Sequence, residues 1–177
     1  MVEYTYLIGS LIIFAIWIIL YILRVDLRKE MIVMGSIFGI LGVTMEAFVY
    51  TKDWWKPPTI TGTIVGIEDF LLGFGIGGVA AVVYEEIFKK KIVLRKKRDH
   101  PHTKQLIIII ITSIIVFNLM FFILKYNSFL SVLIATLMGT IIIWILRRDL
   151  ILDSIFTGFI LTLFAFIDFA ILNIIHS

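Results

Sequence analysis

The chain has 177 residues, of which 60% are hydrophobic and only 16% are charged. A soluble domain carries about 25% charged residues, so this composition excludes a water-soluble globular domain, a disordered chain and a nucleic-acid-binding module. The chain contains no cysteine, which excludes disulfides, thiolate nucleophiles and thiolate metal sites. An integral membrane protein remains, with a modest formal net charge of +3.

Six hydrophobic stretches follow one another along the chain, and each is long enough to cross a bilayer as a helix of about 20 residues. They are too long for the strands of a membrane barrel, which have about 10 residues. The sequence therefore predicts an all-α membrane protein, a six-helix transmembrane bundle that forms one multi-pass domain over residues 1–177 in the cell membrane. The first stretch has no basic segment before it and no cleavage site, so we expect a retained helix. The six stretches are Tyr6–Leu23, Met31–Tyr50, Thr61–Phe88, Leu106–Leu124, Phe129–Leu146 and Leu150–Ile175.

Basic residues are distributed unevenly over the five connections between these stretches. The first, third and fifth connections hold 13 of the 16 Lys and Arg residues, and the other two hold only Lys52, Lys56 and Lys125. The positive-inside rule places the basic connections in the cytoplasm and both termini outside. The largest basic connection, residues 89–105, is also expected to attract anionic lipid headgroups through Lys89–Lys104.

A short motif occurs twice at an offset of 123 residues. Arg24-Val25-Asp26-Leu27 is repeated as Arg147-Arg148-Asp149-Leu150. In each copy an arginine ends one predicted helix and an aspartate begins the next, which suits the helix dipoles. The repeat has two interpretations: independent use of this boundary chemistry, or duplication of a helical hairpin, so that helices 1–2 match helices 5–6.

Carboxylates within predicted spans form the main candidate site. With both termini outside, Glu46, Glu68, Asp69 and Asp168 lie about 6–12 Å below the outer boundary, and Asn118 falls at a similar depth. An ionisable group inside the bilayer is by default a functional candidate. The alternative is that these acids only form hydrogen bonds between helices.

Glycine spacing predicts which helix faces meet. Gly35, Gly39 and Gly42 share a face with Glu46, and Gly73 and Gly77 share a face with Asp69. Small residues at this spacing mark close helix packing in lipid. We therefore expect the second and third helices to be neighbours, with Glu46 near the Glu68–Asp69 pair. A protonated acid beside an ionised one is a usable acid–base pair.

The segment from Asp53 to Glu86 resembles the integral-membrane lycopene cyclase family, the small-subunit, heterodimeric and fungal-fusion type. The resemblance lies in Trp55-Lys56-Pro57-Pro58, Gly62 and Ile67-Glu68-Asp69-Phe70. Family members carry a tryptophan–proline loop, a glycine and a Pro-x-Glu-Glu signature. Here the signature reads Gly66-Ile67-Glu68-Asp69, with glycine for proline and aspartate for the second glutamate, and it occurs once where the family shows it in both halves.

The resemblance implies a lycopene β-cyclase-like isomerase of carotenoid biosynthesis that closes the end ring of a linear carotenoid or related isoprenoid. It implies Glu68 and Asp69 as the acid–base pair with Glu46 as a modulator, and no cofactor or metal. Trp54, Trp55 and Phe70 are expected to shield the carbocation from water, and Asn118 and Asp168 complete the substrate side of the acidic layer. A homodimer or a partner subunit could supply the second signature.

Two other function classes fit the same residues. A small proton-coupled transporter would use the acids as a proton site, with a water path from both sides. A non-catalytic membrane scaffold or partner subunit would use them only to bridge helices. A nucleic-acid partner is not expected.

Overall fold

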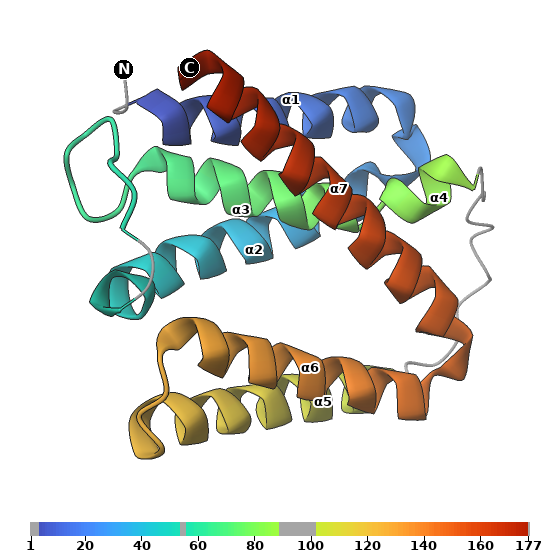
Figure 1. Cartoon of the computed structure of the whole chain (residues 1–177). Helices are drawn as coiled ribbons and strands as arrows, with labels where there is room; N and C mark the ends of the chain where they lie inside the picture. Colours follow the sequence, from blue (N-terminus) through green and yellow to red (C-terminus); the bar gives the residue numbers. More distant parts are fainter. Residues whose placement is uncertain (1–3, 54–55, 89–101, 177) are drawn as a thin grey trace. The chain divides into compact units, whose positions relative to one another are not determined.

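The computed structural model describes residues 4–53, 56–88 and 102–176, and within these ranges all regular structure is helical (Figure 1). This confirms the predicted all-α fold class. The α-helices are α1 (Thr5–Leu23), α2 (Arg28–Phe48), α3 (Ile67–Ala80), α4 (Val83–Ile87), α5 (His102–Asn118), α6 (Ser128–Leu146) and α7 (Ile151–His176). Short elements join them: η2 (Val25–Leu27), η3 (Tyr50–Lys52), the π-helical η4 (Leu119–Ile123) and η5 (Arg148–Leu150).

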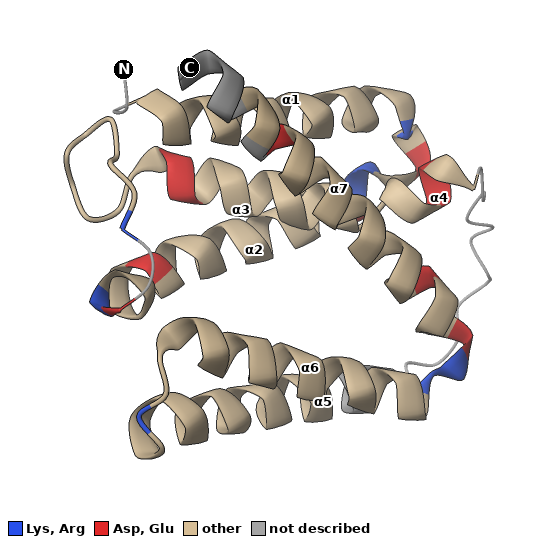
Figure 2. Ribbon diagram, viewed as in Figure 1, with Lys and Arg blue, Asp and Glu red and all other residues tan. Residues whose placement is uncertain are grey.

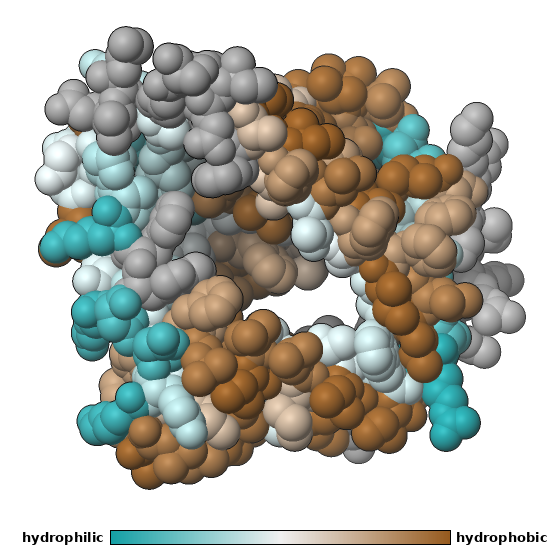
Figure 3. Space-filling model, in the orientation of Figure 1, coloured by the Kyte–Doolittle hydropathy of each residue, from teal (hydrophilic) through white to brown (hydrophobic). Residues whose placement is uncertain are grey.

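Four helical segments are long and apolar enough to cross a membrane: Thr5–Leu23, Val25–Lys52, Ser128–Leu146 and Arg148–Asp168. Isoleucine and phenylalanine side chains on them are exposed, for example Ile145 at 68% and Phe159 at 68%. Charged residues lie mainly near helix ends (Figure 2), and hydrophobic residues cover much of the visible surface (Figure 3). These features indicate association with a membrane, since water would disfavour so much exposed apolar surface. The six-span count and the orientation stay predictions.

The third predicted span, Thr61–Phe88, is not one helix. Residues 61–66 belong to a loop, α3 begins at Ile67 and ends at Ala80, and α4 follows after a break at Val82. At 1.5 Å per residue α3 is about 21 Å long, shorter than the hydrocarbon core of about 30 Å. The prediction of one continuous helix there is therefore wrong.

The chain divides into two compact units. The first unit comprises residues 1–51, 55–92 and 155–177, and the second comprises residues 52–54 and 93–154. In the second unit α5 packs against α6, where Ser113 lies beside Gly139. In the first unit α3 lies between α1 and α2, and α7 adds Ile160 to their common core (Figure 1). The other buried residues of that core are Trp17, Leu20, Leu27, Met31, Val79, Val82 and Val83.

Glycines let α2 and α3 approach until their backbones touch. A Cβ atom built on Gly73 would lie 2.5 Å from the carbonyl oxygen of Phe38, and one built on Gly77 would lie 2.7 Å from that of Met34. On the facing helix, a Cβ atom on Gly35 would lie 2.9 Å from the carbonyl oxygen of Phe74. The predicted packing of these two helices through their glycine faces is confirmed.

The repeated motif forms the same turn in both copies. Arg24 and Arg147 end α1 and α6 with similar backbone angles, φ −107°, ψ 71° and φ −138°, ψ 74°. In each copy the arginine Nε donates to one carboxylate oxygen of the following aspartate, Asp26 or Asp149, at 2.9 Å. Its Nη2 donates to the other oxygen, at 2.9 and 2.7 Å. Such bidentate pairs fix geometry as well as charge, so the motif defines the exit angle of both helices.

The two turns differ in burial. The Arg24 side chain is 10% exposed and has a further partner, Glu86 on α4, at 3.4 Å. The Arg147 side chain is 33% exposed. The hydrogen bond to Asp26 raises the pKa of Arg24, and the hydrogen bond to Asp149 raises that of Arg147. Both guanidinium groups therefore stay charged.

This difference predicts unequal costs for matched substitutions. Asp26→Ala removes the main partner of a guanidinium that is 10% exposed, and we expect the free energy of unfolding to fall by about 2 kcal/mol. Asp149→Ala leaves a guanidinium that water can reach, so we expect a fall below about 1 kcal/mol. Thermal unfolding of both variants in the same detergent measures the difference. Equal losses would show that burial of Arg24 does not matter.

Candidate functional site: a buried carboxylate cluster

Asp69 belongs to the first turn of α3 and is held by two hydrogen bonds. The backbone N–H of Gly66, the residue that caps α3, donates to its Oδ2 atom at 2.7 Å. The hydroxyl of Tyr6 on α1 donates to its Oδ1 atom at 2.5 Å. Asp69 is 4% exposed. A carboxylate here complements the positive end of the α3 dipole, and both of its oxygens act as acceptors.

Glu68 is fully buried and connects α3 to the preceding loop. The backbone N–H of Ile60 donates to its Oε1 atom at 2.6 Å, whereas its buried Oε2 atom has no partner among the described residues. A Cβ atom built on Gly66 would lie 2.0 Å from that Oε2 atom and 2.8 Å from the Cβ atom of Thr59. Glycine at position 66 therefore leaves room for the Glu68 side chain.

The same geometry disfavours proline at position 66. Proline would add a Cβ atom in the space that Glu68 Oε2 and Thr59 fill. It would also remove the N–H that Gly66 donates to Asp69. Glycine at this position thus fits the way both acids are held.

Glu46 brings a third carboxylate to the cluster from α2. It is 3% exposed, and its Oε1 atom is buried without a partner among the described residues. It lies close enough to Asp69 for the two carboxylates to interact electrostatically. The expected proximity of Glu46 to Asp69 is therefore observed, and these two acids come from α2 and α3, which pack together.

Two residues of α1 that were not predicted as site residues also belong to the cluster. Tyr6 contacts Asp69 through its hydroxyl, as described above. The hydroxyl of Ser10, which is fully buried, lies 2.8 Å from the carbonyl oxygen of Tyr6 and 3.3 Å from that of Glu68. The available signal was a pair of polar residues four positions apart at the start of an otherwise apolar helix.

The other expected site residues lie in different surroundings. Phe70 packs on Gly39 of α2 and near Phe74, so it belongs to the α2–α3 interface. Asn118 is in the second unit, exposed, and its amide donates to the carbonyl of Ile114 in its own helix at 2.7 Å. Trp54 and Trp55 lie outside the described residues, as does most of the basic segment 89–105.

Asp168 lies on α7 within the first unit. It follows Phe164 by one helical turn, and Phe164 packs against the core of that unit. Its Oδ1 atom is buried without a partner among the described residues. No hydrogen bond or electrostatic interaction joins it to the three acids of α2 and α3 in the described part of the chain, so it is not counted in the cluster.

The charged side chains of the cluster are all carboxylates. No group of three or more histidine, cysteine or acidic side chains in the described residues has the geometry to hold a metal ion. What the arrangement offers is proton chemistry: one carboxylate with both oxygens accepting hydrogen bonds, and two with a buried oxygen unpartnered. Adjacent carboxylates in different surroundings can divide into an acid and a base.

No family model, curated protein or solved structure matches this chain.

Proposed function

We propose that the chain is a lycopene cyclase-like membrane enzyme that closes the end ring of a linear carotenoid or related isoprenoid by acid–base chemistry. One observation supports this above the others. Glu46, Glu68 and Asp69 meet in one buried cluster, and two of them keep an oxygen without a hydrogen-bond partner in the described structure. A buried polar atom without a hydrogen-bond partner lowers the stability of the fold. Such an atom is therefore more often found where it serves a function. The resemblance of residues 53–86 gives that task its chemical class.

The reaction needs one proton donor and one acceptor. Glu68 donates a proton to the terminal double bond of the substrate, and a neighbouring double bond attacks the cation and forms the ring C–C bond. The resulting tertiary carbocation loses a ring proton to Asp69, which leaves a cyclic olefin. The product is an isomer of the substrate, so the step has no net redox change and uses no cofactor. The proton then returns from Asp69 to Glu68.

The contacts of the three acids support this assignment. Asp69 accepts from Tyr6 and from Gly66, so its carboxylate is held in a fixed orientation, as a positioned proton acceptor requires. Glu68 accepts only one hydrogen bond, and its second oxygen can carry a proton. Glu46 interacts electrostatically with Asp69 and modulates the charge of the pair. Because Glu68 is fully buried, substrate entry requires the loop at Thr59 and Ile60 to move.

Pigment analysis tests the proposal. The chain is expressed in a bacterial host that accumulates lycopene, and the pigments are separated by chromatography. We expect the parent chain to give monocyclic or bicyclic product and Asp69→Asn to give none. The asparagine can still accept from the Gly66 amide and donate to Tyr6, so the fold is kept while the base is lost. If the membrane-inserted parent chain leaves lycopene unchanged, the chain alone does not cyclise lycopene. The enzyme would then need a different isoprenoid substrate or a partner subunit.

A second candidate function is favoured by the same hydrogen bonds. Asp69 accepts from the amide of Gly66, the N-cap of α3, and Glu68 accepts from the amide of Ile60 in the preceding loop. Holding the helix start and the loop is a structural task in its own right. In that case the chain is a membrane scaffold or partner subunit. Lycopene would then stay unchanged in every host strain, and Asp69→Asn would alter neither insertion nor assembly.

A further inference from the structure

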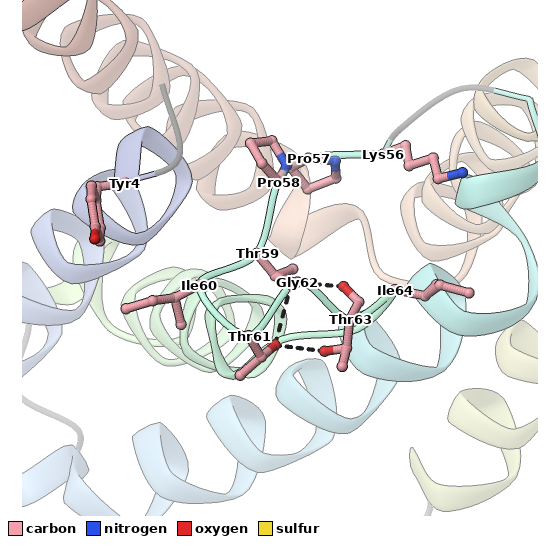
Figure 4. A pocket seen from close by; sticks show the side chains of 10 residues that line it. All are labelled: Tyr4, Lys56, Pro57, Pro58, Thr59, Ile60, Thr61, Gly62, Thr63 and Ile64. Atoms are coloured by element: carbon pink, nitrogen blue, oxygen red, sulfur yellow. Dashed lines mark hydrogen bonds between the residues drawn. The ribbon is translucent and has the colours of Figure 1, made fainter. Parts of the chain in front are cut away.

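The loop between α2 and α3 lines an open pocket. Its volume is about 660 Å³, and it is lined by Tyr4 and residues 56–64 (Figure 4). Pockets that bind small molecules usually span about 300–1,000 Å³. The pocket is therefore large enough for a lipid headgroup.

Hydrogen bonds within the loop keep this pocket formed. Thr59 Oγ1 donates to the carbonyl oxygen of Thr63 at 2.6 Å, and Thr63 Oγ1 donates to that of Val65 at 2.7 Å. The hydroxyls of Thr61 and Thr63 lie 2.6 Å apart (Figure 4). Since Thr63 gives its proton to Val65, Thr61 is the donor of that pair. Gly62 closes the turn with φ at +67°, where glycine is favoured.

The charge of the lining favours an anion. Lys56 is the only lining residue that is charged at neutral pH, and it forms no ion pair with any described residue. The backbone N–H groups of Thr61 and Thr63 donate to no atom of the described structure. An ammonium group and backbone N–H groups without a partner in the described structure are each donors that suit a phosphate.

The apolar surroundings favour a phosphate attached to a lipid. Ile60 and Ile64 are 50% and 62% exposed beside the threonine hydroxyls, and Pro57 and Pro58 add further apolar surface. This loop follows α2, which belongs to a segment apolar enough to span a membrane. The loop thus combines polar and apolar groups at the end of a helix that could cross the bilayer, which is the level of the lipid headgroups.

We propose that the pocket of Tyr4 and residues 56–64 binds the phosphate group of an anionic phospholipid. The ligand would sit beside the carboxylate cluster, because the amide of Ile60 in the pocket wall donates to Glu68. A bound headgroup would hold this wall in place. The proposal does not rest on the cyclase activity, and it is tested by binding alone.

Native mass spectrometry of the full chain in detergent, titrated with phosphatidylglycerol, measures the binding. Removal of one lysine charge near a headgroup costs about 1 kcal/mol, so Lys56→Gln is expected to weaken binding about fivefold. Lys125→Gln is the matched control, because Lys125 is an exposed lysine in the α5–α6 connection, outside the pocket. It removes the same charge and should leave the affinity unchanged.

Inorganic phosphate, added as a competitor, distinguishes the two sources of the group. A Lys56-dependent lipid adduct that resists millimolar phosphate supports a lipid site. If phosphate displaces the lipid from the parent chain but not from Lys56→Gln, the pocket binds phosphate. Free phosphate would then be a ligand as well as the lipid headgroup. Equal weakening by the two lysine substitutions, or no effect of Lys56→Gln, overturns the proposal, because the lipid would then be held by general charge such as that of residues 89–105.

Discussion

Gly73→Ala is expected to lower the free energy of unfolding by about 1–3 kcal/mol, the range for an overpacked interior. The added Cβ atom would lie 2.5 Å from the carbonyl oxygen of Phe38 and 3.1 Å from the Cα atom of Gly39. Both are backbone atoms, so no side chain can turn away, and α2 must move as a whole. Because Glu46 and Asp69 meet across this interface, the same shift also separates the two acids.

Gly158→Ala is the matched control. No atom lies within 4 Å of the position that its Cβ would take, and alanine gains up to about 1 kcal/mol over glycine within a helix. Thermal unfolding of both variants in one detergent should therefore show opposite shifts. A loss at Gly158 as large as that at Gly73 would show that the cost comes from a general effect on membrane insertion and not from contact between α2 and α3.

The pairing of α2 with α3 was predictable because glycine spacing carries directional information that apolar residues lack. In a helix of a water-soluble protein the polar residues mark the outer face. In an apolar membrane helix such as α1, nearly every side chain is apolar and this signal is missing. Only Gly73, Gly77 and their counterparts on α2 show where a neighbour must approach. From that contact the proximity of Glu46 to Asp69 followed, since both acids share the glycine faces.

The remaining features were hidden for physical reasons. The contact of Tyr6 with Asp69 joins residues 63 positions apart, and no local pattern relates them. The break between α3 and α4 falls at Ala81 and Val82, which are neither glycine nor proline. The amide of Ile60 becomes a partner of Glu68 only because Gly66 leaves space for that side chain. Such contacts depend on the path of a loop, which hydropathy does not describe.

Glu68→Gln is expected to reduce cyclisation by about 10²–10⁴-fold, the contribution of a positioned general acid, while the protein stays folded. Glutamine keeps an oxygen that can accept from the Ile60 amide, the hydrogen bond that Glu68 Oε1 makes at 2.6 Å. It has nearly the same volume, so the tight space beside Gly66 is still filled. Only the transferable proton is lost. The measurement is the rate of product formation by purified variants in lipid, with unfolding temperatures recorded alongside.

Glu68→Ala separates the two tasks of this side chain. It removes the proton and also the acceptor of the Ile60 amide, so the loop that begins at Lys56 loses its attachment to α3. We expect Glu68→Ala to lose activity and stability together, whereas Glu68→Gln loses activity alone. If Glu68→Gln cyclises at the parent rate and only Glu68→Ala fails, Glu68 holds the loop and is not the acid. Glu46, whose buried Oε1 atom also lacks a partner in the described residues, would then be the only carboxylate of the cluster left to donate the proton, since Asp69 accepts at both oxygens.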